Sequence, residues 1–367
     1  MDRRELVIDE DITRAETPPG WFYTDAEAWE SARRRIFERT WHCIGDTDQV
    51  SVPRMVAPFT LLPGCLDEPL VLTRDDDDQV HCLSNVCTHR GNLVAEHGGK
   101  SSCLTCRYHG RRFHLDGRFR SMPEFEGVKD FPSRRDNLSP APLARWHQFL
   151  FAGVNPAMDF DAVVREMEER VGWLPIEQAQ LDPSRSRDYL VQANWALYCD
   201  NYLEGLHIPF VHESLDAVLD YGAYETEALE WGVLQLGLCR GGEAVFDIPA
   251  GSPDHGRRIG AYYYWLYPGV MFNIYPWGIS LNLVQPMGPA LTRVLFRSYV
   301  WDATRLEQGA GAGLDRVERE DEAVVEAAHR GLRSRFYQRG RYSPTREQGV
   351  HRFHLLLARQ WRDGAPA

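Results

Sequence analysis

The spacing of hydrophobic and polar residues changes along the chain, and each change predicts a different kind of element. Near the N-terminus, Thr24-Asp25-Ala26-Glu27 has the form of a capping box. Apolar residues follow it at helical spacing, which predicts a helix from Asp25 to about Thr40. From Trp41 to about Asn155 the pattern changes to short β-rich runs separated by turns, which predicts a small all-β domain.

The second half of the chain combines helical and strand patterns. A helical pattern runs from Phe160 to Leu174, and a further helix is expected to begin near Asn194. This helix would carry Glu204 and His207 on one face of its last turn, because Pro209 prevents regular continuation. Strands are predicted at Val233–Cys239, Ala261–Tyr267, Gly278–Val284 and Arg293–Val300. They alternate in places, as the strands of a sheet with one covered face do.

A long helix is predicted from about Leu314 to Gln338. Its apolar stripe is counted as Leu314, Val317, Val324, Ala328 and Leu332. Asp321 occupies the position that completes this series, and a carboxylate on a buried stripe is costly unless it is paired or bound to a metal. Asp321 is therefore a candidate metal ligand. The alternative is a salt bridge to Arg319, Arg330 or Arg335.

Composition narrows the class of protein. With 367 residues, the chain is long enough for two domains, and 43% hydrophobic with 26% charged residues describes an ordinary globular protein. The net charge of -12 argues against nucleic-acid binding, which usually requires a basic surface. We therefore expect no nucleic-acid partner.

No export signal or membrane segment is expected. The first thirty residues contain no apolar h-region. The uncharged stretch from Ile259 to Thr292 is interrupted by prolines and asparagines, which fits buried strands better than a membrane span. We predict a cytoplasmic location. The eight cysteines are then expected to be thiols or ligands rather than a disulfide framework.

Two similar loops each contain a cysteine and a histidine. Sixteen residues separate Cys87-Thr88-His89 from Cys106-Arg107-Tyr108-His109. Two Cys and two His can bind one zinc ion or a two-iron cluster, because thiolate and imidazole suit both. Cys-x-His followed by Cys-x2-His on β-loops is the pattern in which two His replace two Cys on one iron of a [2Fe-2S] cluster. These loops resemble those of Rieske proteins.

Four positions in these loops differ from related Rieske sequences. The family commonly has Pro and Trp where this chain has Arg107 and Arg111, and added positive charge would raise the reduction potential of a nearby cluster. Respiratory-chain Rieske proteins carry a disulfide-forming cysteine in each loop, at positions that hold Asn92 and Tyr108 here. The differences affect the expected potential but not the expected ligands.

A second candidate metal segment runs from Asp200 to His212. Two imidazoles, His207 and His212, lie five residues apart, and the carboxylate of Glu204 precedes the first by three residues. The alternative is two unrelated core histidines. Together with Asp321, the two histidines complete a two-His, one-carboxylate set, the ligand set of non-haem Fe(II) oxygenases.

With both motifs present in this order, nearly the whole chain resembles the α subunit, or terminal oxygenase component, of Rieske-type non-haem iron oxygenases. The resemblance implies a [2Fe-2S] cluster held by Cys87, His89, Cys106 and His109, and a mononuclear Fe(II) held by His207, His212 and Asp321. It implies that Glu204 carries electrons between the two sites and that Asn201 lies beside the iron. It further implies a head-to-tail homotrimer. The electrons would come from NAD(P)H through a separate flavin and iron-sulfur reductase, and this chain shows no nucleotide-binding glycine motif of its own.

The resemblance also implies the fold class and the domains. We predict an α+β fold, in which an all-β Rieske domain at 45–155 is joined to a catalytic domain formed by 1–44 and 156–367. The catalytic domain would contain a large antiparallel sheet covered by helices, of the helix-grip type.

The expected activity is hydroxylation of a small organic substrate with O2. The C-terminal sequence, including His351 and His354, resembles the choline- and betaine-oxidising branch, and both histidines are expected to be packing or interface residues. Five aromatic residues could form a cage for a quaternary ammonium group or could simply pack a sheet: Tyr263, Trp265, Tyr267, Tyr275 and Trp277. The alternatives are an aromatic-ring hydroxylating dioxygenase and, in another class, a Rieske electron carrier without oxygenase activity.

Overall fold

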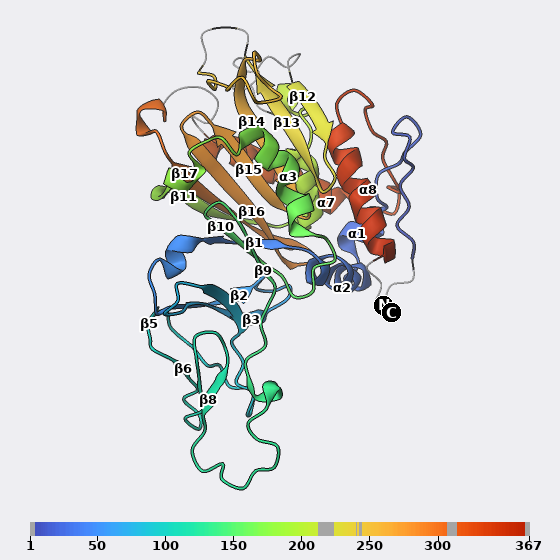
Figure 1. The fold of residues 1–367 in the computed structure, drawn as a ribbon. Coiled ribbons are helices and arrows are strands. Elements are labelled where there is room, and N and C mark those ends of the chain that lie inside the picture. Colours follow the sequence, from blue (N-terminus) through green and yellow to red (C-terminus); the bar gives the residue numbers. More distant parts are fainter. Residues whose placement is uncertain (1–3, 212–223, 240, 242–243, 307–313, 364–367) are drawn as a thin grey trace. The chain divides into compact units, whose positions relative to one another are not determined.

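The computed structural model describes residues 4–211, 224–239, 241, 244–306 and 314–363 (Figure 1). The chain forms two compact units. One consists of Thr40–Ala157, and the other combines Met1–Arg39 with Met158–Ala367.

The smaller unit is built from short antiparallel strands in three sheets. Their orders are β1-β10-β9, β4-β3-β2-β5 and β6-β7-β8. The strands are β1 (His42–Asp46), β2 (Met55–Leu61), β3 (Glu68–Arg74), β4 (Val80–Ser84), β5 (Gly99–Lys100), β6 (Leu104–Thr105), β7 (Arg112–Phe113), β8 (Phe119–Ser121), β9 (Leu143–Trp146) and β10 (Phe149–Ala152). Cys87 and Cys106 belong to the apolar core of this unit, together with Val71, Leu104 and Phe113. The core therefore reaches into both predicted ligand loops.

The larger unit is organised around a seven-stranded antiparallel sheet. Its order is β11-β17-β16-β15-β14-β13-β12, and each pair of neighbours is antiparallel. The strands are β11 (Gln180–Val191), β12 (Tyr224–Ala228), β13 (Gly232–Leu238), β14 (Ile259–Leu266), β15 (Val270–Tyr275), β16 (Gly278–Gly288) and β17 (Leu291–Val300). The predicted α+β class and the large antiparallel sheet are confirmed.

Helices lie beside this sheet (Figure 1). They are α1 (Gly20–Thr24), α2 (Ala26–Arg35), α3 (Phe160–Val171), α4 (Trp195–Tyr202), α5 (Ile208–Val211), α7 (Leu314–Gly331) and α8 (Gln348–Asp363). The end of α4 is tied to the sheet, since Tyr202 donates a hydrogen bond from Oη to Asn273 on β15 (2.8 Å) and accepts one at its carbonyl from Gln235 on β13 (3.0 Å). The sheet therefore fixes the place at which α4 ends.

Two predicted helix ends before residue 210 are wrong. The N-terminal helix α2 has Asp25 as its N-cap and ends at Arg35, and the short 3-10 helix Phe37–Arg39 takes the place of its predicted last turn. The helix that begins after Asn194 ends at Tyr202, so Glu204 and His207 lie beyond it. The next helix, α5, includes Pro209 in its first turn, where a missing N–H costs no hydrogen bond.

The predicted apolar stripe of α7 is also wrong. Helix α7 ends at Gly331, and Val324 is 39% exposed, whereas Glu318, Val325 and His329 are buried. The buried residues recur at i, i+7 and i+11, which is a regular helical face. The polar residues of this face can be buried because they have hydrogen-bond partners: Glu318 accepts from Tyr198, and His329 accepts from the N–H of Asn194. The side chains of Leu314 and Val317 lie outside the described part of the helix.

Candidate metal centres

Each predicted ligand loop of the smaller unit closes in the same way. The N–H of Gly91 donates to the carbonyl of Cys87, and the N–H of Gly110 donates to the carbonyl of Cys106, both at 3.0 Å. The two glycines have φ angles of 71° and 73°, in the left-handed region that favours glycine. The matching glycines thus give both loops the same tight turn.

The two loops bring their histidines together and their cysteines together. The Nδ1 atoms of His89 and His109 lie 3.2 Å apart. Two nitrogen ligands at about 2.1 Å from a tetrahedral ion would lie about 3.4 Å apart, so this spacing fits two imidazoles on one iron. Cys87 and Cys106 are both buried, and they lie close enough for Cys106 to affect the pKa of the Cys87 thiol. Burial is the main reason that the pKa of the Cys87 thiol is raised, and the neighbouring Cys106 raises it further.

A two-iron cluster needs its ligands in pairs. The His89–His109 and Cys87–Cys106 pairs match a cluster in which one iron has two imidazoles and the other has two thiolates. The donor set fits a Rieske cluster better than one structural zinc.

In the larger unit, His207 lies between two carboxylates. Its Nδ1 is 2.6 Å from Oε1 of Glu204, and its Nε2 is 3.3 Å from Oδ1 of Asp321. Asn201, at the end of α4, donates from Nδ2 to the same Oδ1 of Asp321 at 3.1 Å. The predicted third ligand, His212, lies outside the described residues. The structure therefore brings together Asn201, Glu204, His207 and Asp321 from three separate segments.

The distances around His207 fit a metal ligand held by a carboxylate. Two ligands at about 2.1 Å from an ion and at right angles to each other lie about 3.0 Å apart, close to the His207–Asp321 separation. Glu204 occupies the other ring nitrogen, which fixes the ring orientation. Burial lowers the pKa of His207, but hydrogen bonds to Asp321 and Glu204 outweigh burial and raise this pKa to about 9. Two anionic groups thus converge on one imidazole.

Glu204 also shapes the backbone between the two helices. Its Oε2 accepts hydrogen bonds from the main-chain N–H groups of Leu206 and His207, the latter at 3.1 Å. A carboxylate at the start of a helix suits the unpaired N–H groups there. The contact between Glu204 and His207 was predicted from helical spacing, but it arises from this turn.

Helix α7 is held against α4 by a buried polar contact that the sequence did not reveal. Tyr198 donates its hydroxyl to the carboxylate of Glu318, with both oxygens at 2.9 Å. One turn along α7 from Glu318 lies Asp321, so this contact places the predicted ligand opposite His207. In the sequence, Glu318 is visible only as one more charged residue of the predicted helix. Neither its burial nor its contact with Tyr198 could be recognised there.

His351 and His354 are engaged away from His207. Nε2 of His351 lies 2.8 Å from the carbonyl oxygen of Asp9. His354 is 1% exposed, with Nε2 at 2.8 Å from Asp200 and Nδ1 at 2.6 Å from the Tyr342 hydroxyl. Their expected role in packing stays a prediction. The pairing of His354 with Asp200, next to Asn201, was missed.

The five aromatic residues proposed for a cage form two groups. Tyr275 stacks on Trp277 at 5.2 Å and meets Tyr263 edge-on at 5.9 Å. Trp265 contacts Tyr267 at 5.9 Å and also packs on Phe353 of α8 at 4.9 Å. Most of these contacts join aromatic side chains of the sheet to one another or to a covering helix. They support packing rather than one five-membered cage.

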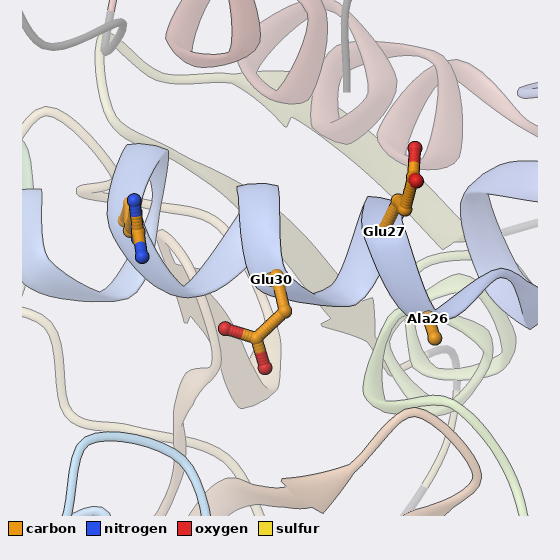
Figure 2. A pocket seen from close by; sticks show the side chains of 4 residues that line it. Ala26, Glu27 and Glu30 are labelled. Carbon is orange, nitrogen blue, oxygen red and sulfur yellow. The ribbon is translucent and has the colours of Figure 1, made fainter. Parts of the chain in front are cut away.

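A surface hollow on α2 is separate from these groups. It has a volume of about 350 Å³, and its described lining consists of Ala26, Glu27, Glu30 and Arg34. Figure 2 shows Glu27 and Glu30 extending from α2 in different directions. None of these side chains belongs to the predicted metal sites. The hollow therefore gives no information about the substrate.

No helix in the described part of the chain is long and apolar enough to cross a membrane.

Comparison with known proteins agrees with the two sites. Residues 40–132 match the Rieske [2Fe-2S] domain, and residues 172–362 match the catalytic domain of the ring hydroxylating alpha subunit. The chain belongs to this family of Rieske-type oxygenase alpha subunits. The predicted family is thereby confirmed.

Several relatives share this organisation. The chain is 33% identical to the chloroplastic choline monooxygenase of Arabidopsis thaliana, covering 97% of this chain and 86% of the relative. It is 27% identical to the carnitine monooxygenase oxygenase subunit of Escherichia coli (strain K12), covering 95% and 94%. A crystal structure of the quaternary ammonium Rieske monooxygenase CntA with L-carnitine shares the fold, with a TM-score of 0.77, 22% identity, and coverage of 98% and 99%.

These findings define the general chemistry of the protein. It is a terminal oxygenase with a Rieske [2Fe-2S] cluster and a mononuclear iron, and it uses O2 and electrons supplied from outside the chain. The predicted enzyme class and cofactors are confirmed.

Proposed function

We propose that this oxygenase oxidises a quaternary ammonium compound, the substrate class of choline and carnitine. The proposal is supported by the similarity to choline monooxygenase along nearly the whole chain. In a monooxygenation, one oxygen atom of O2 enters a C–H bond and the other leaves as water, with two electrons and two protons consumed. The second candidate is ring hydroxylation, which is favoured only by the description of the catalytic-domain family.

We assign the cluster ligands to Cys87, His89, Cys106 and His109. The support is the pairing of the two imidazoles at 3.2 Å and of the two buried thiols. Because the Nδ1 atoms face each other, the Nε2 atoms of both rings remain for contacts outside the cluster. The predicted domain limits, 45–155 for the cluster and 1–44 with 156–367 for catalysis, are part of this proposal.

We assign the mononuclear iron to His207, His212 and Asp321. The observation that carries the assignment is the position of His207, whose Nε2 is 3.3 Å from Asp321 while Glu204 holds its Nδ1 at 2.6 Å. When bound, such an iron supplies O2 activation at its open coordination positions. Asn201 holds Oδ1 of Asp321 and so orients that carboxylate.

Glu204 is proposed to connect the iron site with the Rieske cluster of a neighbouring subunit. Its carboxylate touches His207 through the ring nitrogen opposite the one that faces Asp321, so it can transmit a charge change without binding the metal. This role requires a head-to-tail homotrimer, which we propose as the assembly. A solved structure of a quaternary ammonium Rieske monooxygenase is reported to reveal insights into inter-subunit electron transfer.

Basic residues are concentrated near the cluster ligands, which suits contacts with another protein subunit. The segment 86–136, which contains the cluster ligands, has ten Arg and Lys against six Asp and Glu, although the whole chain carries a net charge of -12. A basic region around the cluster favours association with acidic surfaces.

The electron donor is proposed to be a separate flavin and iron-sulfur reductase using NAD(P)H. The cytoplasmic location stays a prediction.

The function is tested by measuring O2 consumption and product with a surrogate reductase. Choline, betaine, carnitine and simple aromatic acids are supplied in turn, and Asp321→Ala serves as the matched inactive control. We expect product from a quaternary ammonium compound only, with about three irons per wild-type chain and about two in the variant. Product from aromatic acids alone would support ring hydroxylation. Two irons in both proteins and no product would indicate an electron carrier.

A further inference from the structure

The second ligand loop is followed by a buried guanidinium. Arg111 is 2% exposed, and its guanidinium carbon lies over the rings of Phe113, Phe119 and Phe131 at 5.7, 5.0 and 5.5 Å. A charge that is removed from water is costly unless it is paired. Aromatic faces attract a cation but do not neutralise it. Arg111 therefore needs an anionic partner inside the unit.

That partner is Asp136. Nη2 of Arg111 donates to Oδ1 of Asp136 at 2.8 Å and to its carbonyl oxygen at 3.1 Å. Oδ2 accepts from the N–H and the hydroxyl of Ser133 at 2.8 and 3.0 Å. Burial raises the pKa of Asp136, but the hydrogen bonds from Arg111 and Ser133 outweigh this effect, so the pKa is lowered. The carboxylate is therefore ionised, and the pair carries no net charge.

Asp136 also joins the two ligand loops. Thr88, between Cys87 and His89, donates its hydroxyl to the carbonyl oxygen of Asp136 at 2.9 Å. Arg111 binds the same carbonyl, and its own carbonyl accepts the N–H of Cys106 at 2.8 Å. Asp136 thus joins the first loop directly through Thr88 and the second loop through Arg111.

We propose that Arg111 and Asp136 are positioning residues of the Rieske cluster, which clamp the two ligand loops together and place a charge-balanced pair beside the cluster. The proposal rests on the cluster assignment made above. It explains how this chain accommodates arginine after the second loop. The guanidinium does not act as an uncompensated positive charge, because its counter-ion is built into the same clamp.

The two charges should act on the cluster with opposite signs. Reduction adds an electron, so a nearby positive charge stabilises the reduced form and a negative charge destabilises it. Arg111 lies two residues after His109, and its carbonyl oxygen accepts the N–H of Cys106 at 2.8 Å, so its charge lies beside the proposed ligands. Removing either partner would therefore expose the effect of the other.

The experiment compares four variants of the full-length protein: Asp136→Asn, Arg111→Gln, the double variant, and Arg112→Gln. Arg112 is the matched control, because it is the adjacent arginine and is exposed. The midpoint potential of the cluster is measured by redox titration followed by EPR, together with iron and sulfide content. We expect a higher potential in Asp136→Asn, a lower one in Arg111→Gln, and values close to wild type in the double variant and in the control.

Different results overturn the proposal. If the midpoint potentials of the two single variants shift in the same direction, or if both are unchanged, Arg111 and Asp136 do not act as a charge-balanced pair. If a single variant loses its cluster, the double variant decides: it should retain the cluster, because no buried charge is left unpaired. Gln and Asn can still hydrogen-bond to each other and keep the loops joined, so loss of the cluster in the double variant as well overturns the proposal. A wild-type protein without the rhombic EPR signal would instead contradict the cluster assignment itself.

Discussion

Glu204 shows how a single side chain combines two tasks. One carboxylate oxygen binds the ring of His207, and the other accepts main-chain N–H groups at the start of α5. The first contact concerns the metal ligand and the second concerns the path of the chain. A substitution that keeps an acceptor for the main-chain N–H groups but removes the charge beside His207 can separate the two.

Replacing Glu204 with Gln is such a substitution. The Oε1 of Gln can still accept the main-chain N–H groups, but its amide nitrogen then faces His207 and cannot accept from the ring. We therefore expect both metals to remain bound while product formation falls by roughly 10–100-fold, the usual effect of losing an outer partner of a metal ligand. The measurement is single-turnover product with the cluster reduced beforehand, alongside iron analysis. Glu204→Asp keeps the charge and should retain more activity than Gln. Equal single-turnover yields in wild type and Glu204→Gln would rule out a role in electron transfer.

Arg111 also illustrates the residue scale. The sequence shows an arginine where the family commonly has tryptophan, and it suggests a raised cluster potential. The structure adds Asp136, twenty-five residues further along, as its counter-ion. Whether the charge of Arg111 acts on the cluster therefore depends on a partner that no local pattern identifies.

At the scale of elements, α7 determines where Asp321 lies. The helix was predicted, but the buried face is not its apolar stripe. The face holds Glu318, whose carboxylate is bound by Tyr198 of α4, and it leaves Val324 exposed. Periodicity alone favours apolar residues inside, so it misassigns a helix whose buried contacts are polar.

The face of α7 can be tested with two neighbouring valines. Val325 is 2% exposed and Val324 is 39% exposed. Both substitutions to Ala gain the same helix propensity, but only Val325→Ala truncates a fully buried side chain, so the two free energies of unfolding should differ by about 1–2 kcal/mol. Urea unfolding followed by tryptophan fluorescence measures this difference. Greater destabilisation by Val324→Ala than by Val325→Ala would show that the predicted apolar stripe, which contains Val324, is the buried face.

Helix α4 shows a second limit at this scale. Its beginning was predicted correctly, because the side chain of Asn194 caps it and accepts the N–H of Ala196 at 3.0 Å. Its end was not, because Tyr202 is held by Gln235 and Asn273 on the distant sheet. Caps are local signals, whereas this termination depends on tertiary contacts.

For the whole molecule, the central prediction is electron transfer between subunits. A head-to-tail trimer would let the iron of one chain receive electrons from the cluster of the next. A chain with a defective cluster and a chain with a defective iron site should then complement each other. His109→Ala and Asp321→Ala are suitable partners, since each removes one proposed ligand.

The two variants are co-expressed with different tags, and mixed oligomers are purified over both affinity resins. In a mixed head-to-tail trimer, one of the three junctions pairs an intact iron site with an intact cluster, so we expect about one third of the wild-type activity. Each variant alone should be inactive. Inactive mixed oligomers that retain the expected metal content would contradict transfer between subunits.

The sequence by itself determined the family, the two-part organisation and the proposed ligand types. This was possible because the Cys-His pairs and the His207–His212 spacing are local, and residues close in the chain stay close in space. The confirmed family and fold class rest on these motifs and on the strand pattern that follows them.

The tertiary structure decided which distant groups meet. Asp321 faces His207 because Tyr198 and Glu318 hold α7 against α4, and Asp136 neutralises Arg111 while it joins two loops. Such pairings depend on packing between segments far apart in the chain, and burial makes each unpaired polar group costly. Local patterns therefore identify candidate ligands, while long-range packing fixes their orientation and their charge.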